Sequence, residues 1–234
     1  GKILETAICT TIKSISRDEW EACRSSRAGG DPFLSYDFFF LLETSNSVGP
    51  KTGWIPFYII FKEKNIVVGI IISFLKNHSQ GEYVFDHSWA DAYERSGGNY
   101  YPKLQVAVPF TPVSGERILV QSEYEDKVGE MISSAKRLVE ENNLSSLHIT
   151  FCSKSFVGVA KKNNLLVREG IQYHWFNRDY KSFDDFLGSL TYRKRKNITK
   201  ERKQASNFGG EIKSLTGSQL TDLELESFWH FYQN

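Results

Sequence analysis

Residues 101–119 read YPKLQVAVPFTPVSGERIL and combine a strand pattern with features that end a strand. Residues 104–108 alternate in the way that is typical of a half-buried β-strand. Pro109 and Pro112 follow, and neither has a backbone N–H with which to extend a central ladder. The stretch therefore predicts a strand that stops early and leaves its neighbour unpaired, which opens a gap where a ligand can bind.

The turn after these prolines contains residues suited to holding an anion. Gly115 lets the backbone approach a ligand closely, and the Arg117 guanidinium can make a forked contact with phosphate or carboxylate. A helix predicted over residues 122–142 begins just beyond, and the free N–H groups of a helix start favour an anion. We predict that Gly115 and Arg117 bind substrate; the alternative is a rigid corner with a solvated arginine.

A βαβ pattern extends outward from this stretch. Residues 122–142 carry apolar side chains on one helical face, and residues 147–151 form a short strand. Because such crossovers are right-handed, we expect the strands at 104–108 and 147–151 to be parallel neighbours joined by that helix. Upstream, residues 54–62 and 66–75 predict a hairpin. The fold class is therefore mixed α/β (α+β), with an antiparallel start and a parallel middle.

The other elements are predicted from caps and periodicity. Ser16 and Glu19 form a capping box, and Ser35 caps a helix rich in aromatic residues. Further strands are predicted over 5–15, 167–176 and 211–215, and further helices over 17–24, 88–95, 155–163, 182–207 and from Ser218 to the last residue.

The composition is that of an ordinary globular protein. The 234 residues are 40% hydrophobic and 24% charged, with a net charge of +1, so any anion site must arise from local clustering. Three scattered cysteines match no disulfide framework or zinc spacing, which suits a reducing cytoplasm, and no metal site is predicted. No apolar run is long enough to cross a bilayer. We expect a cytoplasmic protein and leave peripheral membrane contact open.

Four segments resemble the FemAB-like predicted N-acyltransferases, which are described as peptidoglycan biosynthesis or recognition proteins. The resemblance implies a GNAT-like acyl-CoA N-acyltransferase fold, a mixed sheet with splayed parallel central strands. It also implies a first unit over 1–190, then a basic linker helix and the start of a truncated second unit over 191–234. The segments are YVFDHSWADAYERSGGNYYPKLQVAVPFTPVSGERIL (83–119), SLHITF (146–151), REGIQYHWFNRDYKSFDDFL (168–187) and RKRKNITKERK (193–203).

The resemblance also implies a reaction and its participants. An acyl or aminoacyl group would pass to an amine of a small molecule or a muropeptide. The donor would be aminoacyl-tRNA or acyl-CoA, used as a co-substrate without any tightly bound cofactor, and tRNA is a candidate partner. Two alternatives stay open: a non-catalytic module that recognises a cell-wall precursor, and a binder of tRNA, nucleotide or anionic membrane. The sequence leaves the oligomeric state open.

The segment DHSWADAYE contains the candidate catalytic residues Asp86, His87 and Asp91. An amine that attacks an acyl group must lose a proton, and a positioned carboxylate or imidazole can accept it. The resemblance favours a substrate pocket here. The alternative is that Asp86 or Ser88 merely caps the helix.

Three candidate substrate-binding residues, Tyr93, Tyr100 and Lys103, lie in and just after this segment. Aromatic side chains that flank a lysine can line a groove for a sugar or a peptide, or they can protect a strand edge with charge. His148 is predicted to be structural.

Residues 193–203 form a basic segment with seven basic side chains and one acidic residue, Glu201. So many like charges repel one another unless an anion is present, although a charge run is usually a solvated face. With the resemblance, we predict that Arg193, Arg195 and Lys196 bind substrate phosphates. The segment has no aromatic residues for base stacking, which argues against sequence-specific RNA reading.

Overall fold

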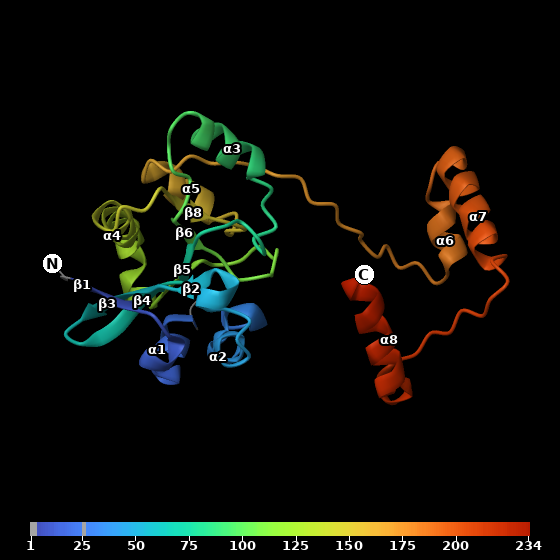
Figure 1. Cartoon of the computed structure of the whole chain (residues 1–234), viewed down its shortest axis with the longest axis horizontal. Coiled ribbons are helices and arrows are strands. Elements are labelled where there is room, and N and C mark those ends of the chain that lie inside the picture. The colour runs from blue at the N-terminus through green and yellow to red at the C-terminus, as the bar shows by residue number, and fades with distance from the viewer. Residues whose placement is uncertain (1–3, 25–26) are drawn as a thin grey trace. The chain divides into compact units, whose positions relative to one another are not determined.

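The computed structural model describes residues 4–24 and 27–234, and the chain divides into two units (Figure 1). The first unit is Gly1–Glu169 and the second is Gly170–Asn234. All strands found among the described residues belong to the first unit. Residues 167–176 form coil instead of the predicted strand.

One antiparallel sheet of four strands lies in the first unit. Its strand order is β1-β3-β4-β7, with each strand antiparallel to its neighbour. A tight turn joins β3 to β4, as the hairpin pattern predicted. The strands are β1 (Glu5–Cys9), β3 (Tyr58–Glu63), β4 (Ile66–Ile71) and β7 (Ile118–Val120).

A second sheet of four strands continues from the first. The strand order is β2-β5-β6-β8, and β6 and β8 are parallel, with Leu104 opposite Leu147. The predicted parallel pair is therefore confirmed. The strands form two sheets, and both sheets include part of one long hairpin, in which β3 pairs with β4 and β2 pairs with β5. The strands are β2 (Trp54–Pro56), β5 (Ser73–Lys76), β6 (Lys103–Val106) and β8 (Leu147–Ile149).

The strand that the prolines were predicted to end does end there. Val106 of β6 lies opposite Ser73, and after an excursion of the chain Ile118 of β7 lies opposite Ile71. β6 and β7 thus follow one another along the same hairpin strand, but only β6 pairs with β8. The prediction that the neighbouring strand is left unpaired is wrong for the hairpin, because Ala107 N–H donates to the Ile72 carbonyl and Ile72 N–H donates to the Arg117 carbonyl. The interruption is on the other side, where β7 lies at the edge of its sheet and only β6 continues to β8.

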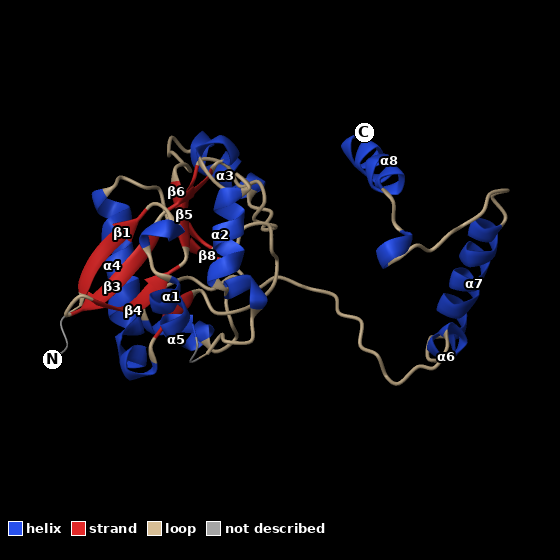
Figure 2. Cartoon of the chain, turned by 90° about the horizontal axis from the view of Figure 1, so that it is seen from below, coloured by secondary structure: helices blue, strands red, loops and turns tan. Residues whose placement is uncertain are grey.

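Helices cover both faces of these sheets (Figure 2). α1 (Arg17–Arg24) and α2 (Tyr36–Thr44) cover one face, where Trp20 packs with Tyr58. α4 (Val128–Glu141) and α5 (Phe156–Lys162) cover the other, where Met131 packs in the same core as Ile59. Neighbouring residues of a strand point to opposite faces, so the alternation in β3 supplies both cores.

Several predicted elements differ in the structure. The first strand stops at Cys9, and Ile12–Ser14 forms a 3-10 turn instead. The predicted helix over 182–207 is two helices, separated at residues 189–191. Residues 211–215 form no strand. The helices of the second unit are α6 (Phe183–Gly188), α7 (Tyr192–Ser206) and α8 (Asp222–Gln233).

Two of the predicted caps are confirmed, but the helix predicted to start at Ser218 begins at Asp222 instead, with Thr221 at its N-cap position. Glu19 N–H is bonded to Ser16 Oγ at 3.2 Å, and Ser16 N–H to Glu19 Oε2 at 3.0 Å. Ser35 accepts a hydrogen bond from Phe38 N–H at the start of α2. Within the described residues, no helix is both long enough and apolar enough to cross a membrane.

Candidate functional site

Two lysines lie side by side on one face of the second sheet. Lys76 on β5 is opposite Lys103 on β6, and both side chains are fully buried. Leu104 and Val106 point to the opposite face, into the core under α4. Strand alternation therefore places buried charge on the face that residues 77–102 cover, and this charge requires partners inside the protein.

Two buried carboxylates balance the lysines. Lys103 Nζ lies 2.8 Å from Glu82 Oε2 and 3.1 Å from Asp86 Oδ2. Lys76 Nζ lies 4.0 Å from Glu82 Oε1 and donates instead to the Gln80 carbonyl at 3.0 Å. We call Lys76, Lys103, Glu82 and Asp86 the ion cluster. Removing one member of such a cluster leaves an uncompensated buried charge, which is strongly destabilising.

Asp86 is the hub of this cluster rather than a helix cap. It occupies the N-cap position of α3 (His87–Arg95), but its side chain makes no capping bond. Its Oδ2 accepts hydrogen bonds from Tyr100 OH at 2.7 Å, Ser79 Oγ at 3.0 Å and Lys103. Burial raises the pKa of the Asp86 carboxyl, but the Tyr100 bond and the Lys103 charge outweigh it and leave the pKa below its ordinary value.

The same interactions set the protonation of the neighbouring groups. Burial and the bond to Asp86 raise the pKa of Tyr100 well above its ordinary value, so Tyr100 stays a proton donor. Burial raises the pKa of Glu82 and lowers the pKa of Lys76 to about 8. Glu82 Oε1 and Asp86 Oδ1 are buried without a hydrogen-bond partner among the described residues. The cluster thus keeps acceptor capacity that the folded chain does not use.

A row of aromatic rings lies beside the ion cluster. The ring centre of Tyr100 is 6.2 Å from that of Tyr93, 5.0 Å from that of Tyr101 and 5.8 Å from that of His148. His148 Nε2 is 3.0 Å from Ser146 Oγ. Burial and the Lys103 charge lower the pKa of His148 to about 4, so its imidazole is neutral at pH 7. The row connects the surface of α3 to strand β8.

The other two candidate catalytic residues lie outside the ion cluster. His87 and Asp91 are exposed on α3. Asp91 lines a shallow surface hollow together with Glu94 and Arg95. The structure therefore brings Asp86 together with Tyr100 and Lys103, and it leaves His87 and Asp91 facing solvent.

The buried Arg117 side chain connects the loop after β6 to the residue that follows β8. Its Nε donates to the Thr150 carbonyl at 2.9 Å and its Nη2 to the Val113 carbonyl at 2.6 Å. The side chain is buried, and burial lowers its pKa to about 10. A Cβ on Gly115 would lie only 2.9 Å from Asp31 Oδ2. Both residues therefore make close internal contacts at the point where the strands part.

The basic helix α7 lies in the second unit with its charged side chains uncompensated. Among the described residues, none of its lysines or arginines forms a salt bridge, and Arg193 and Lys196 are exposed while Arg195 is half-buried. Seven basic residues and the single Glu201 thus leave the helix strongly positive.

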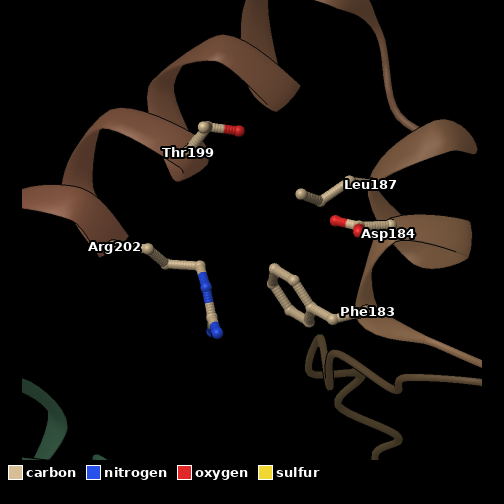
Figure 3. Close-up of a pocket in the computed structure, with 5 residues that line it drawn as sticks. All are labelled: Phe183, Asp184, Leu187, Thr199 and Arg202. Carbon is tan, nitrogen blue, oxygen red and sulfur yellow. The ribbon is translucent and has the colours of Figure 1, made fainter. Parts of the chain in front are cut away.

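A pocket lies between α6 and α7 (Figure 3). The Arg202 guanidinium lies 4.0 Å from the centre of the Phe183 ring, and Leu187 forms the buried base. Asp184 and Thr199 complete the lining. Among the described residues, Asp184 and Arg202 form no salt bridge with each other, and both side chains are exposed to solvent.

Several members of the site carry no recognisable signal in the sequence. Glu82 lies in a turn with no motif, and Ser79 and Tyr101 carry no spacing signal. The one available signal was Lys76, a charged residue at the end of an apolar strand whose partner becomes visible only once the strand register is known. In the part of the chain that the structure describes, no group of three or more His, Cys, Asp or Glu side chains is placed to hold a metal ion.

The fold is GNAT-like, with a parallel strand pair, a crossover helix and a break in the ladder beside it. The chain belongs to the FemAB-like family, described as peptidoglycan biosynthesis or recognition, whose model matches residues 11–234. No match is found among curated proteins.

Solved structures similar to this chain include acetyltransferases. An aminoglycoside N-acetyltransferase AAC(6')-Iy, solved in complex with CoA, is 12% identical, with a TM-score of 0.45 over 76% of this chain and 97% of its own. A ribosomal-protein-alanine N-acetyltransferase from Brucella melitensis is 11% identical, with a TM-score of 0.43 over 74% of this chain and 100% of its own. A Trypanosoma brucei acetyltransferase is 11% identical, with a TM-score of 0.40 over 74% and 100%.

Proposed function

We propose that the protein is an N-acyltransferase that transfers an acyl or aminoacyl group to an amine of a peptidoglycan precursor. Membership of the FemAB-like family supports this class of reaction. The observation that carries the assignment to a site is the ion cluster, which joins Asp86, Lys103 and Tyr100 beside the parallel strands. A buried network of hydrogen-bonded and charged side chains, next to exposed aromatic and acidic side chains, is typical of a functional site.

The reaction needs a nucleophile, a proton acceptor and a leaving group. The amine nitrogen forms a bond to the acyl carbon, and the ester bond of an aminoacyl-tRNA or the thioester bond of acyl-CoA breaks. The proton from the attacking nitrogen passes to a base on the protein, and the leaving hydroxyl or thiol regains a proton. No covalent enzyme intermediate is required, and the protein contributes by positioning the amine and accepting its proton.

The side chains divide into those that can touch the amine and those that position others. Asp91 and His87 are exposed on α3 and are the groups that can accept a proton from bound substrate. Asp86 is buried and acts by holding Tyr100, while Lys103 holds Asp86. In this proposal Tyr93 and Tyr100 border the acceptor, and Gly115 and Arg117 shape the break between the sheets.

A transfer assay tests the proposal. The full chain is incubated with a muropeptide and either aminoacyl-tRNA or acyl-CoA, and the acylated product is measured by mass spectrometry. Asp91→Asn should lower kcat by about 10²–10⁴, the range for loss of a general base. Asp126→Asn, which makes the same chemical change at an exposed position just before α4, is the matched control and should leave kcat unchanged.

Two outcomes would overturn parts of the proposal. Equal turnover for Asp91→Asn and the parent protein would remove Asp91 from the catalytic role. Tight binding of the muropeptide without transfer from either donor would favour a recognition module over an enzyme.

A second candidate function is binding of an anionic ligand through α7. The observation that favours it is the absence of salt bridges to the α7 lysines and arginines within the described chain. Phosphates of a nucleotide-linked precursor or of tRNA would supply the missing negative charge, and Arg193, Arg195 and Lys196 would contact them. The alternative remains a solvated helix.

The salt dependence of ligand binding distinguishes an α7 that binds anions from an α7 that is only a solvated helix. The triple variant Arg193→Gln, Arg195→Gln, Lys196→Gln should bind tRNA or a UDP-linked muropeptide more weakly and with a shallower dependence on salt. Lys154→Gln, Lys161→Gln, Lys162→Gln changes the charge equally at exposed positions of the first unit and serves as the control. Equal affinity and equal salt slope in both triple variants would leave α7 without a role in anion binding.

A further inference from the structure

We propose that Trp89, Tyr93 and Tyr100 form a stacking site for the pyranose ring of a neutral saccharide. The inference rests on the proposed function, because this saccharide would be the sugar part of the acceptor. The observation behind it is the exposure of large rings on α3: Trp89 is 62% and Tyr93 is 50% exposed. A folded protein that leaves such rings in water at one place commonly uses them for binding.

Trp89 and Tyr93 lie on one face of α3. They are four residues apart, which places their side chains one helical turn apart on the same side. Tyr100 extends the row from Tyr93 toward β8, with ring centres 6.2 Å apart. Figure 1 shows α3 on the outer side of the first unit, away from α1 and α2. The three rings therefore line a path from the surface of α3 toward the ion cluster.

The rings near the ion cluster are held in place before a ligand arrives. Tyr100 OH donates to the buried Asp86, and the Tyr93 ring packs so closely on Gly98 that a Cβ there would lie 2.4 Å from a ring atom. Rigid aromatic side chains lose little conformational entropy on binding. Because these rings are already ordered, stacking on them has a small entropic cost.

The guanidinium group of an arginine lies over the Trp89 ring. The Arg168 guanidinium lies 6.0 Å from the centre of the Trp89 ring. A planar group with hydrogen-bonding edges can therefore approach this ring in the folded chain. A pyranose has the same combination of an apolar face and polar edges, so it fits a surface of aromatic faces with polar groups nearby.

The charges around the row favour a neutral ligand. The ion cluster has two lysines and two carboxylates, and its charges cancel. Asp91 lies two residues from both Trp89 and Tyr93 and therefore faces the other side of α3, so the hollow lined by Asp91, Glu94 and Arg95 adds no charge to the row. A cation would gain from the aromatic faces, but the positive charge of Arg168 over the Trp89 ring would repel it. A neutral saccharide uses the aromatic faces without needing a counter-charge.

The experiment measures binding of N-acetylglucosamine and methyl glucoside to the full chain without any acyl donor. Saturation-transfer NMR and tryptophan fluorescence follow the titration. We expect dissociation constants in the millimolar range for the parent protein. Trp89→Ala and Tyr93→Ala should each weaken binding at least fivefold. Trp175→Ala is the matched control, because Trp175 is 64% exposed in the second unit, and it should bind like the parent.

Further probes separate stacking from other modes of binding. Tyr100→Phe keeps the ring and removes the hydroxyl, so it should retain sugar binding. Cyclohexanol is the apolar probe and spermidine is the cationic probe. Trp89→Ala should bind each of them no more weakly than Trp175→Ala does. Circular dichroism checks that each variant is folded.

Three results would overturn the inference: no sugar binding by the parent protein up to about 50 mM, equal affinity for Trp89→Ala and Trp175→Ala, or a preference for spermidine that depends on Trp89. Sugar binding that depends on Trp89, in a protein that transfers no acyl group, supports the inference and counts only against the proposed enzyme activity.

Discussion

At the residue scale, buried Lys103 shows how one side chain links stability to the site. Its three hydrogen bonds, to Ser79, Glu82 and Asp86, use all three N–H groups of the ammonium. The same bonds fix the Asp86 carboxylate, which in turn accepts from Tyr100. A change at Lys103 should therefore affect both folding and the geometry of the aromatic row.

Lys103→Met should lower the free energy of unfolding of the first unit by about 3–5 kcal/mol, because it leaves two buried carboxylates with one lysine. Urea unfolding followed by tryptophan fluorescence measures the change. Adding Glu82→Gln to Lys103→Met should recover part of the loss, since it removes one unpaired charge. Lys162→Met, at an exposed position of α5, is the control. A loss for Lys103→Met no larger than that of the control would contradict the buried cluster.

His148 gives a prediction for pH. Burial and the Lys103 charge lower its pKa from 6.5 to about 4 in the folded chain, so between these values the unfolded chain binds more protons. The stability that the neutral imidazole contributes is present above about pH 6.5 and is lost as the pH falls toward 4. Thermal unfolding from pH 7.5 to 4 should show a shallower acid loss for His148→Gln than for the parent protein. His87→Gln, exposed in the same unit, should keep the parental slope; identical slopes for both variants would rule out the His148 contribution.

At the element scale, the helix α4 carries the periodicity that made the fold predictable. Its buried residues include Met131, Ile132 and Ala135, which the sequence placed on one face at helical spacing. The parallel pair β6–β8 followed from this helix, because a crossover of that length returns the chain to the same sheet in the same direction. The helices with clear caps were also predicted, since capping is local in the sequence.

Elements that depend on distant partners were predicted poorly. Residues 167–176 alternate partly like a strand, but no neighbouring strand pairs with them in the described chain, and they form coil. Glu82 was missed because only the register of β5 against β6 brings Lys76 and Lys103 together above it. Asp86 was singled out, yet its burial could not be read from the sequence, where the same residue also fits a helix cap.

Met131→Ala tests the packing of α4 on the sheet. The Met131 side chain is fully buried, and its Cε would lie 2.5 Å from a Cβ placed on Gly69. Truncation should lower the free energy of unfolding by about 2–5 kcal/mol. The denaturant midpoint of the full chain measures it, with Ser133→Ala on the exposed side of α4 as the control. Equal midpoints for the two variants would mean that α4 does not pack as described.

At the scale of the whole molecule, the chain consists of two units with different character. The first contains the sheets, both cores and the ion cluster, and the second contains the basic helix α7. Arg178 and Lys181 lie exposed in the segment before α6. Limited trypsin digestion of the folded chain should cut there before it cuts the first unit, because cleavage needs exposed backbone without regular structure. Early cleavage within the first unit would contradict the division.

Hydrogen–deuterium exchange with and without a saturating muropeptide tests the central claim, that the acceptor site lies beside the ion cluster. We expect slower exchange in the peptides that cover residues 86–103 and 147–150, and a loss of this effect in Trp89→Ala and Asp86→Asn. Slower exchange confined to α7, with residues 86–103 unchanged, would contradict it.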